Sequence, residues 1–254
     1  MPGMFSRLFG RQEEKKSDFE IVSDDEEESS DFVESLKVNL TRLIAYAQSA
    51  DVVLQREVAE RLANEAVKPD RQVQIVECDG LRLLVPLVKS EDTDVRRLAA
   101  HALANLSVNQ QNQILMAKEG AIEMLIGLLS TPHALAQRQS AKALANLGVN
   151  ADNKRNIVLA GAIPPLVELM FSENVSVRIE AVAAVANLAV LSANATDIVA
   201  GGGLEPVVDG ARLAMSELLD VNDVYEVDEN MEELAAQCGR ALRNLSANPE
   251  NRPL

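Results

Sequence analysis

Apolar residues recur along this chain at the spacing of α-helices rather than of strands. Ile122, Leu125 and Leu129 are separated by three or four positions, which places them on one face of a helix. Gly120 precedes them, where a tight turn needs a residue that tolerates a positive φ. We therefore expect a short helix over residues 121–129 that follows a sharp turn and packs through one apolar side.

Two further helices complete a unit of three between residues 109 and 149. The first helix is expected to end at Glu119, just before the turn. Thr131 is expected to cap the third helix and Pro132 to occupy its first position, where a missing amide hydrogen costs no intrahelical bond. The third helix then runs to about Val149, with alanine and leucine on its inward side.

This pattern repeats along the chain. Each third helix carries an asparagine in a phrase of the type Ala-Leu-Ala-Asn-Leu, and four of these asparagines lie 41 residues apart, with a fifth 57 residues further on. They are Asn64, Asn105, Asn146, Asn187 and Asn244. A period of about 40 to 47 residues is typical of helical solenoids, in which each unit buries its apolar side against its neighbours. The chain is therefore expected to be an all-α solenoid with third helices centred near residues 64, 105, 146, 187 and 244.

Two more positions follow the same period. Glycines expected in the turns stand 15 or 16 residues after the asparagines, at Gly80, Gly120, Gly161 and Gly202. A second set of asparagines stands seven residues after the first set, at Asn112, Asn153, Asn194 and Asn251. Arg71 interrupts this second set in the first copy. Independent markers on one period support a single register for the whole array.

Two phrases indicate the type of repeat. The phrases Gly-Ala-Ile at Gly120 and Gly-Ala-Ile-Pro-Pro-Leu-Val at Gly161, each joined to an Ala-Asn-Leu phrase, resemble armadillo repeats. The resemblance covers roughly residues 35–254. It implies a right-handed superhelical solenoid of about four to five three-helix repeats, in which the third helices line a concave groove.

The resemblance also implies a binding role for the asparagines, whose side-chain amides would hold the backbone of an extended peptide. Positions four and eight residues before each asparagine share that side of the helix, one and two turns away. In the first three repeats these positions are mainly basic. The expected peptide-binding groove therefore comprises the five asparagines together with Arg56, Arg97, His101, Arg138, Lys142 and Arg240. An alternative is that the arginines only balance local acidic groups.

Two kinds of armadillo protein can be compared at these positions. Importin-alpha-like receptors place tryptophan four residues before the asparagine, and this chain contains none. Beta-catenin-like grooves are basic and bind acidic extended partners, which Arg97, His101, Arg138 and Lys142 match in kind. The resemblance therefore implies a non-enzymatic scaffold or adaptor that binds an extended, acidic peptide of a protein partner.

Composition and motifs agree with a binding protein. The chain is 47% hydrophobic but only 3% aromatic, as expected where helices stack through Ala, Leu and Val. No catalytic motif or cofactor motif stands out, so no enzyme activity and no cofactor are predicted. Cys78 and Cys238 lack metal-ligand spacing, so they are expected to be plain thiols in a reducing compartment, with no metal site. The expected localisation is cytoplasmic, with the nucleus as an alternative.

Charge is concentrated at the N-terminus. The net charge is −15, and residues 1–34 hold four basic and eleven acidic residues. We expect residues 1–34 to be a disordered acidic tail, and the net charge argues against nucleic acid as a partner. Ser23 is followed by acidic residues, which makes it a phosphorylation candidate. Because the tail and the basic groove are opposite in charge, an intramolecular contact between them is expected.

The last repeat and the two ends depart from the pattern. The surplus residues of the last repeat fall at 216–233, an acidic stretch expected to form a mobile loop. The chain ends where a sixth copy would begin, so we expect Leu242 and Leu245 to lie uncovered in the N-terminal part of a longer array. Two alternatives remain open for the function: the substrate-recruiting portion of a ubiquitin ligase, or an adaptor that touches a membrane through residues 1–12.

Overall fold

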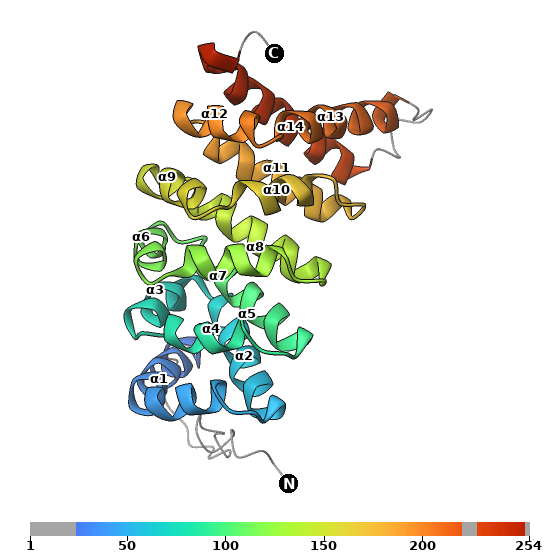
Figure 1. The fold of residues 1–254 in the computed structure, drawn as a ribbon. Helices are drawn as coiled ribbons and strands as arrows, with labels where there is room; N and C mark the ends of the chain where they lie inside the picture. Colours follow the sequence, from blue (N-terminus) through green and yellow to red (C-terminus); the bar gives the residue numbers. More distant parts are fainter. Residues whose placement is uncertain (1–23, 220–227, 252–254) are drawn as a thin grey trace.

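The computed structural model describes residues 24–219 and 228–251, with side chains described from residue 34. This part of the chain consists of α-helices joined by short turns, stacked layer upon layer from the N-terminal to the C-terminal end (Figure 1). The expected phosphorylation site Ser23, the membrane-contact segment 1–12 and the proposed contact between tail and groove involve residues outside this range. No helix in the described part is long and apolar enough to cross a membrane.

Three kinds of helix alternate after the N-terminal helix α1 (Asp24–Ala47). The third helices of the repeats are α2 (Val52–Ala66), α5 (Thr93–Leu106), α8 (Ala134–Leu147), α11 (Val175–Leu188) and α14 (Glu229–Ala247). The first helices are α3 (Pro69–Glu77), α6 (Gln110–Lys118), α9 (Ala151–Leu159) and α12 (Ser192–Ala200). The second helices are α4 (Leu81–Leu87), α7 (Ala121–Leu129), α10 (Ile163–Met170) and α13 (Leu204–Leu219). A short 3-10 helix, η2 (Pro249–Asn251), follows α14.

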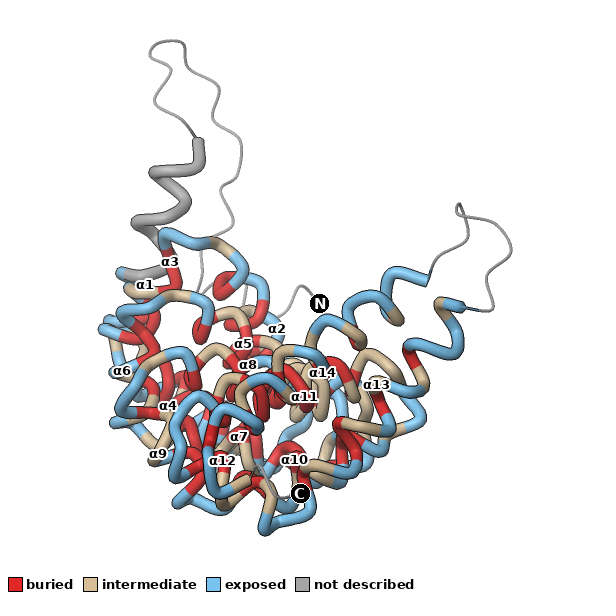
Figure 2. Tube along the Cα trace, turned by 90° about the horizontal axis from the view of Figure 1, so that it is seen from above, coloured by how far each residue is buried: buried red, intermediate tan, exposed pale blue. Residues whose placement is uncertain are grey.

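The third helices form the spine of the array. Each one packs on the next, in the order α2, α5, α8, α11 and α14. Viewed from above, they lie together inside the curve of the molecule, while the first and second helices form its outer side (Figure 2). Buried alanines on their packing faces, such as Ala99, Ala141 and Ala184, let these helices approach closely. The all-α solenoid expected from the period is thus confirmed.

The turn before each second helix explains the repeated glycines, with one correction. Gly120, Gly161 and Gly202 adopt left-handed φ values of 81°, 89° and 83°. In the first repeat Asp79, with φ 59°, occupies this position instead of Gly80. Gly80 is required for a different reason, because a Cβ there would lie 2.5 Å from the carbonyl oxygen of Ile75. The first glycine therefore does not share the register of the other three.

The start of the third helix in the second repeat also differs from the expectation. The second helix α7 spans Ala121–Leu129 as expected, but α8 begins at Ala134, after Pro132. Thr131 is buried and its hydroxyl donates to the carbonyl oxygen of Leu128 at 2.9 Å, so it serves the end of α7 rather than the start of α8. The first residue outside α8 is His133, which makes no side-chain cap bond.

The boundary of the expected tail at residue 34 is wrong, because α1 begins at Asp24. A segment too acidic to fold alone can extend a helix that is anchored further along, because propagation costs far less than nucleation. Leu36, Leu43 and Ala47 provide that anchor in the core. The acidic residues at the start of the segment occupy the helix N-terminus, where the helix dipole favours negative charge.

The acidic insertion is also more helical than expected. Helix α13 continues to Leu219 and α14 begins at Glu229, so only residues 220–228 of the expected loop lie outside the described helices. The two lengthened helices pair as a hairpin that projects beyond the layered body (Figure 2). Gly210 permits their close approach, because a Cβ there would lie 3.0 Å from the Cys238 sulfur. The insertion therefore lengthens two packed helices.

The end of α14 is more covered than expected. Leu245 is 2% exposed and Leu242 is partly buried, because α11, α12 and α13 all pack on α14. The turn after α14 folds back onto α12, where Asn248 Nδ2 donates to the carbonyl oxygen of Ser192 at 3.1 Å. The expectation that Leu245 lies uncovered is wrong.

Candidate functional site

The structure places the repeated asparagines near the C-terminal ends of their helices rather than at the helix centres. Asn64 is exposed, and the other four are half-buried. Three side-chain amides donate to the preceding layer: Asn187 Nδ2 to Ala145 O at 2.8 Å, Asn244 Nδ2 to Ala186 O at 2.8 Å, and Asn146 Nδ2 to Ser107 Oγ at 3.1 Å. Asn105 Nδ2 is buried without a partner. These bonds give the asparagines a structural role in joining layers, and their role in holding a peptide stays a prediction.

The second set of asparagines is wholly structural. Asn112 Nδ2 donates to the carbonyl oxygens of Gln72 at 2.8 Å and of Leu106 at 3.0 Å, and Asn194 Nδ2 repeats this with Lys154 at 2.9 Å and Leu188 at 3.2 Å. Each amide thus joins two first helices and satisfies a carbonyl at the end of a third helix. In the sequence, these asparagines were recognisable because they recur seven residues after the first set. That recurrence did not reveal which carbonyl oxygens accept their hydrogen bonds.

In the first repeat Arg71 occupies the position of these asparagines. Its buried guanidinium pairs with the buried carboxylate of Glu65, which also lies 3.2 Å from Arg61 Nη2 and 3.5 Å from Lys68 Nζ. A buried charge needs such partners because desolvation otherwise disfavours it strongly. An ion-pair cluster therefore takes the place of an amide bridge here, which explains the interruption in the sequence pattern.

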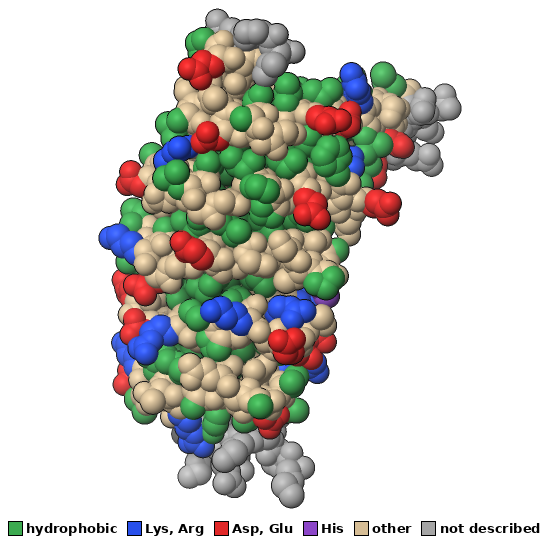
Figure 3. Space-filling view, viewed as in Figure 1, with side chains coloured by type: hydrophobic (Ala, Val, Ile, Leu, Met, Phe, Trp, Pro, Cys, Tyr) green, Lys and Arg blue, Asp and Glu red, His purple; other side chains and the backbone are tan. Residues whose placement is uncertain are grey.

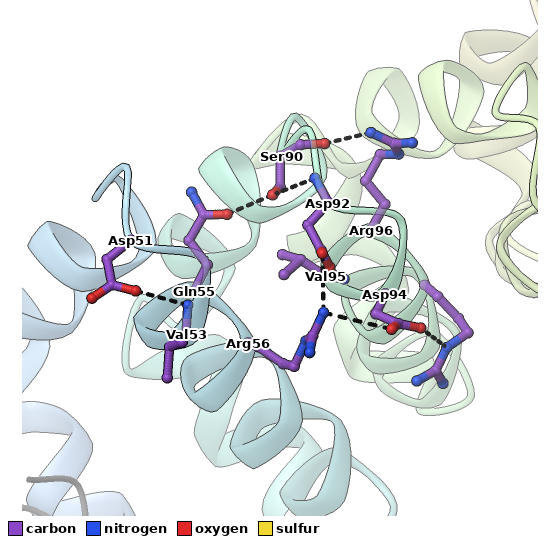
Figure 4. A network of polar contacts seen from close by, with 10 residues as sticks. Asp51, Val53, Gln55, Arg56, Ser90, Asp92, Asp94, Val95 and Arg96 are labelled. Atoms are coloured by element: carbon purple, nitrogen blue, oxygen red, sulfur yellow. Dashed lines mark hydrogen bonds and ion pairs between the residues drawn. The ribbon is translucent and has the colours of Figure 1, made fainter. Parts of the chain in front are cut away.

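The basic residues expected along the groove are partly neutralised by carboxylates of the protein itself. Arg56 reaches from α2 to Asp92 at 3.0 Å and Asp94 at 3.6 Å at the start of α5, as Figure 4 shows. Arg97 Nε lies 3.4 Å from Asp94, and Arg138 Nε lies 3.9 Å from Glu180 on α11 (side-chain contacts). Such half-exposed ion pairs contribute only about 0–1 kcal/mol each. All three arginines thus lie beside carboxylates. This arrangement is the one that the alternative of local charge balance predicts.

The pKa of Asp92 lies below its usual value in this network. The main cause is the hydrogen bond that its carboxylate accepts from the Val95 amide, and Arg56 beside it acts in the same direction. Asp92 is also the residue that caps the start of α5. The carboxylate is therefore occupied both by the helix end and by Arg56.

A second group of basic residues is less well balanced. We call Arg97 and His101 on α5, together with Lys142 on α8, the α5–α8 patch. Partial burial lowers the pKa of His101, and the positive charges of Arg97 and Lys142 lower it further. Lys142 is exposed, and no described carboxylate lies within 4 Å of its ammonium group. Positive charge is therefore concentrated between α5 and α8.

The inner surface changes character further along the array. At α11 the corresponding positions are Ile179 and Ala183, both nearly buried, and Arg240 Nη2 of α14 lies 3.4 Å from the carbonyl oxygen of Ala183. Burial raises the pKa of Glu180, with Lys142 and Arg138 opposing that rise and Glu233 adding to it. The sequence did not single out Glu180 or Glu233. The basic character expected for the groove thus belongs mainly to its N-terminal part.

The outer side carries one cavity of about 500 Å³ between α4 and α7. Its lining combines apolar and charged residues: Val85, Val88, Lys89, Glu119, Gly120, Glu123, Met124 and Gly127. Figure 3 shows the outer face, where hydrophobic side chains are visible in the furrows between helical layers. None of the residues expected to bind a peptide lines this cavity, so the two surfaces are separate.

Comparisons with known proteins agree on the type of repeat. The family model of the armadillo/beta-catenin-like repeat matches residues 68–108, 109–149 and 150–190, each of which contains one complete set of three helices. No curated protein matches the chain. The repeat boundaries fall in the short connections before the first helices, at the same register that the asparagines mark.

Several solved structures that share this architecture are engineered proteins. An engineered protein of the Northeast Structural Genomics Consortium is 30% identical with a TM-score of 0.70, over 87% of this chain and 51% of its own, so this chain spans about half of its length. A designed armadillo repeat protein is 25% identical with a TM-score of 0.69, over 83% of this chain and 84% of its own. Another, in complex with the peptide (KR)4, is 23% identical with a TM-score of 0.61, over 84% and 94%. With its three matched repeats and this architecture, the chain belongs to the armadillo repeat family.

Proposed function

We propose that this chain is a non-enzymatic scaffold whose inner surface binds an extended, acidic segment of a protein partner. The observation that carries the proposal is the α5–α8 patch, where the positive charges of Arg97 and Lys142 both act on His101 within an acidic protein. A designed armadillo repeat protein holds the peptide (KR)4, which supports a peptide as the kind of ligand that this fold accommodates.

The asparagines support an extended backbone rather than a helix as the bound form. In the bonds of Asn146, Asn187 and Asn244 the amide nitrogen is the donor, so each side-chain oxygen remains available as an acceptor. Consecutive asparagines lie on consecutive layers of the spine, in one line along the inner surface. A chain that runs across the layers could donate its backbone N–H groups to successive oxygens.

Charge reversal on the inner surface tests this function. The probes are a labelled peptide of alternating glutamate and glycine and its lysine counterpart, with binding measured by fluorescence anisotropy. We expect the acidic peptide to bind and the Arg97→Glu/Arg138→Glu double variant to lose that binding. The melting temperature should change little, since exposed substitutions usually alter stability by about 0.5 kcal/mol or less.

A matched control has the same change in net charge on another surface. Arg82 follows the first turn and Lys118 ends α6, and both are exposed. The Arg82→Glu/Lys118→Glu variant should therefore retain most of the binding. If both double variants lose binding equally, only the net charge matters; if neither loses it, the site is not on the inner surface. Either result would overturn the proposed groove.

A further inference from the structure

The α5–α8 patch has features that a simple acid-binding surface does not require. Arg97 and His101 are four residues apart on α5, so they share one side of that helix. Lys142 acts on the His101 ring from the next third helix, α8. Two cationic groups, one from each helix, therefore act on one half-buried imidazole.

Few carboxylates balance this patch. Arg97 contacts Asp94 at 3.4 Å, but Asp94 also lies 3.6 Å from Arg56, so one carboxylate serves two arginines. The carboxylate of Glu180 lies 3.9 Å from Arg138, and Arg138 and Lys142 both act on it, so this carboxylate also serves two cations. For the described residues, no carboxylate lies within 4 Å of His101 or Lys142. A compact anion with more than one negative charge would restore the balance.

We infer that the α5–α8 patch binds the phosphate of a phosphorylated serine or threonine within the partner's extended segment. This inference rests on the proposed function and specifies one position of the ligand. A phosphate carries about −1.5 to −2 charges and three acceptor oxygens, whereas a carboxylate carries one charge and two oxygens. The fixed charges of Arg97 and Lys142 match a dianion, and their guanidinium and ammonium donors can reach several oxygens at once.

Binding of this anion is coupled to a proton. In the free protein, burial, Arg97 and Lys142 hold the pKa of His101 below its usual value, so the ring is neutral at pH 7. A bound phosphate favours the imidazolium and raises that pKa. Affinity therefore increases as the pH falls from the pKa of His101 in the complex toward its lower pKa in the free protein, because the complex binds more protons than the free protein. Below about pH 6 protonation of the phosphate itself opposes the effect.

The charged neighbours of His101 are the groups that can influence its protonation. Arg97 lies on its own helix, Lys142 and Arg138 lie on α8, and Glu60 occupies the equivalent position on α2. Glu60 is exposed and is not among the groups that shift the pKa of His101. The two cations that lower the pKa of His101, Arg97 and Lys142, are therefore the same two that a bound phosphate would contact.

The test compares three labelled peptides that differ at one central position. They are short Gly/Ser/Asp peptides with phosphoserine, serine or aspartate in the centre, and inorganic phosphate serves as a fourth probe. We expect the phosphoserine peptide to bind at least about tenfold more tightly than the serine peptide and several-fold more tightly than the aspartate peptide. Lys142→Gln should remove most of this preference, Lys142→Arg should retain it, and Lys118→Gln on the outer side should leave it unchanged.

The two histidines give a second readout. The chain contains only His101 and His133, so their ring signals in a proton NMR titration are separable, and His133 lies in the turn before α8 as an internal control. The pKa of His101 should rise on saturation with the phosphoserine peptide, and the ring signals of His133 should not respond to the peptide. Inorganic phosphate should produce a weaker effect at much higher concentration.

Each outcome separates this inference from the proposed function. Equal binding of the phosphoserine and aspartate peptides, with no change in the pKa of His101, would refute the phosphate site and leave the acidic-peptide function intact. Failure of all three peptides to bind would refute both. Inorganic phosphate as tight as the phosphoserine peptide would show a free-phosphate site and refute the peptide part of the inference.

Discussion

A side-chain amide carries two donor hydrogens, so a single asparagine can satisfy two carbonyl oxygens that lie on different helices. Asn194 does this between α9 and the end of α11, and it is fully buried. Removing such a group leaves buried carbonyl oxygens without a donor, which costs more than the hydrogen bond itself contributed. At the scale of the residue, the second set of asparagines thus links adjacent layers through side-chain hydrogen bonds.

Substitution of Asn153 by alanine tests this fastening. Asn153 is 3% exposed and its amide donates to the carbonyl oxygen of Gln113 at 2.9 Å. We expect Asn153→Ala to lower the free energy of unfolding by about 1–3 kcal/mol in urea denaturation. Asn156 lies on the same helix but is exposed, so Asn156→Ala should change stability by only about 0.5 kcal/mol. Equal losses in both variants would contradict the fastening.

The turn residues show that the sequence reveals where a glycine recurs more easily than why a glycine is needed there. Gly80 lies near the period of the other glycines and was assigned the same role. In fact Asp79 has the left-handed φ, and Gly80 is needed only because Ile75 leaves no room for a Cβ. Steric crowding by a residue five positions earlier has no periodic signal, so only the folded turn distinguishes the two reasons for a glycine.

At the scale of the element, helix existence and helix period were predictable, whereas helix ends were not. Apolar spacing located α7 correctly, but the start of α8 and the start of α1 were misplaced, because Thr131 bonds backward to Leu128 and acidic residues extend a helix anchored at Leu36. Both errors depend on what lies next to the residue in space. The lengthened α13–α14 hairpin has the same origin, since its helices stabilise each other.

The α13–α14 contact makes a specific prediction about two glycines. A Cβ at Gly210 on α13 would lie 3.0 Å from the Cys238 sulfur, whereas a Cβ at Gly239 on α14 meets nothing within 4 Å. We expect Gly210→Ala to lower the melting temperature despite the better helix propensity of alanine, and Gly239→Ala to raise stability by up to about 1 kcal/mol. Differential scanning calorimetry of the two variants measures both effects.

A third variant distinguishes crowding from other causes. Cys238 is fully buried, and burial raises its pKa to about 11, so the side chain acts as a neutral apolar group at neutral pH. Adding Cys238→Ala to Gly210→Ala should recover part of the lost stability by vacating the space beside residue 210. If the double variant is less stable than the sum of the two single changes, close packing against the sulfur is not the reason for Gly210.

At the scale of the whole molecule, the inner surface was predictable in position but not in charge. The resemblance to armadillo repeats implied that the third helices line the inner surface, and the structure places them inside the curve of the molecule (Figure 2). The uniform basic ladder was an incomplete description, because Arg56 and Arg138 lie beside carboxylates that are 36 and 42 residues away in the sequence. Among the described groove residues, Arg97 and Lys142 remain as the two cations that act on His101.

The two sets of asparagine bonds also determine how the array can bend. Between α8–α9 and α11–α12 the layers are joined on both edges by part-buried hydrogen bonds, inside by Asn187 and outside by Asn194. We expect a change in curvature there to require that one of these bonds breaks. Between α2 and α5 the outer fastening of Asn112 is present, but Asn105 makes no inner one, and the exposed ion pairs of Arg56 take its place. Salt screens exposed charges over about 8 Å at physiological ionic strength.

We therefore expect the α2–α5 contact to respond more to salt than the later contacts of the stack. Raising the salt concentration should loosen the α2–α5 joint and leave the later joints stiff, which small-angle X-ray scattering would register as a change in the radius of gyration. Arg56→Met should abolish that response, and Arg82→Met, on an outer turn, should not. Because the α5–α8 patch includes residues of α5, we expect ionic strength to change the distance between the first layer and a segment bound at the proposed site.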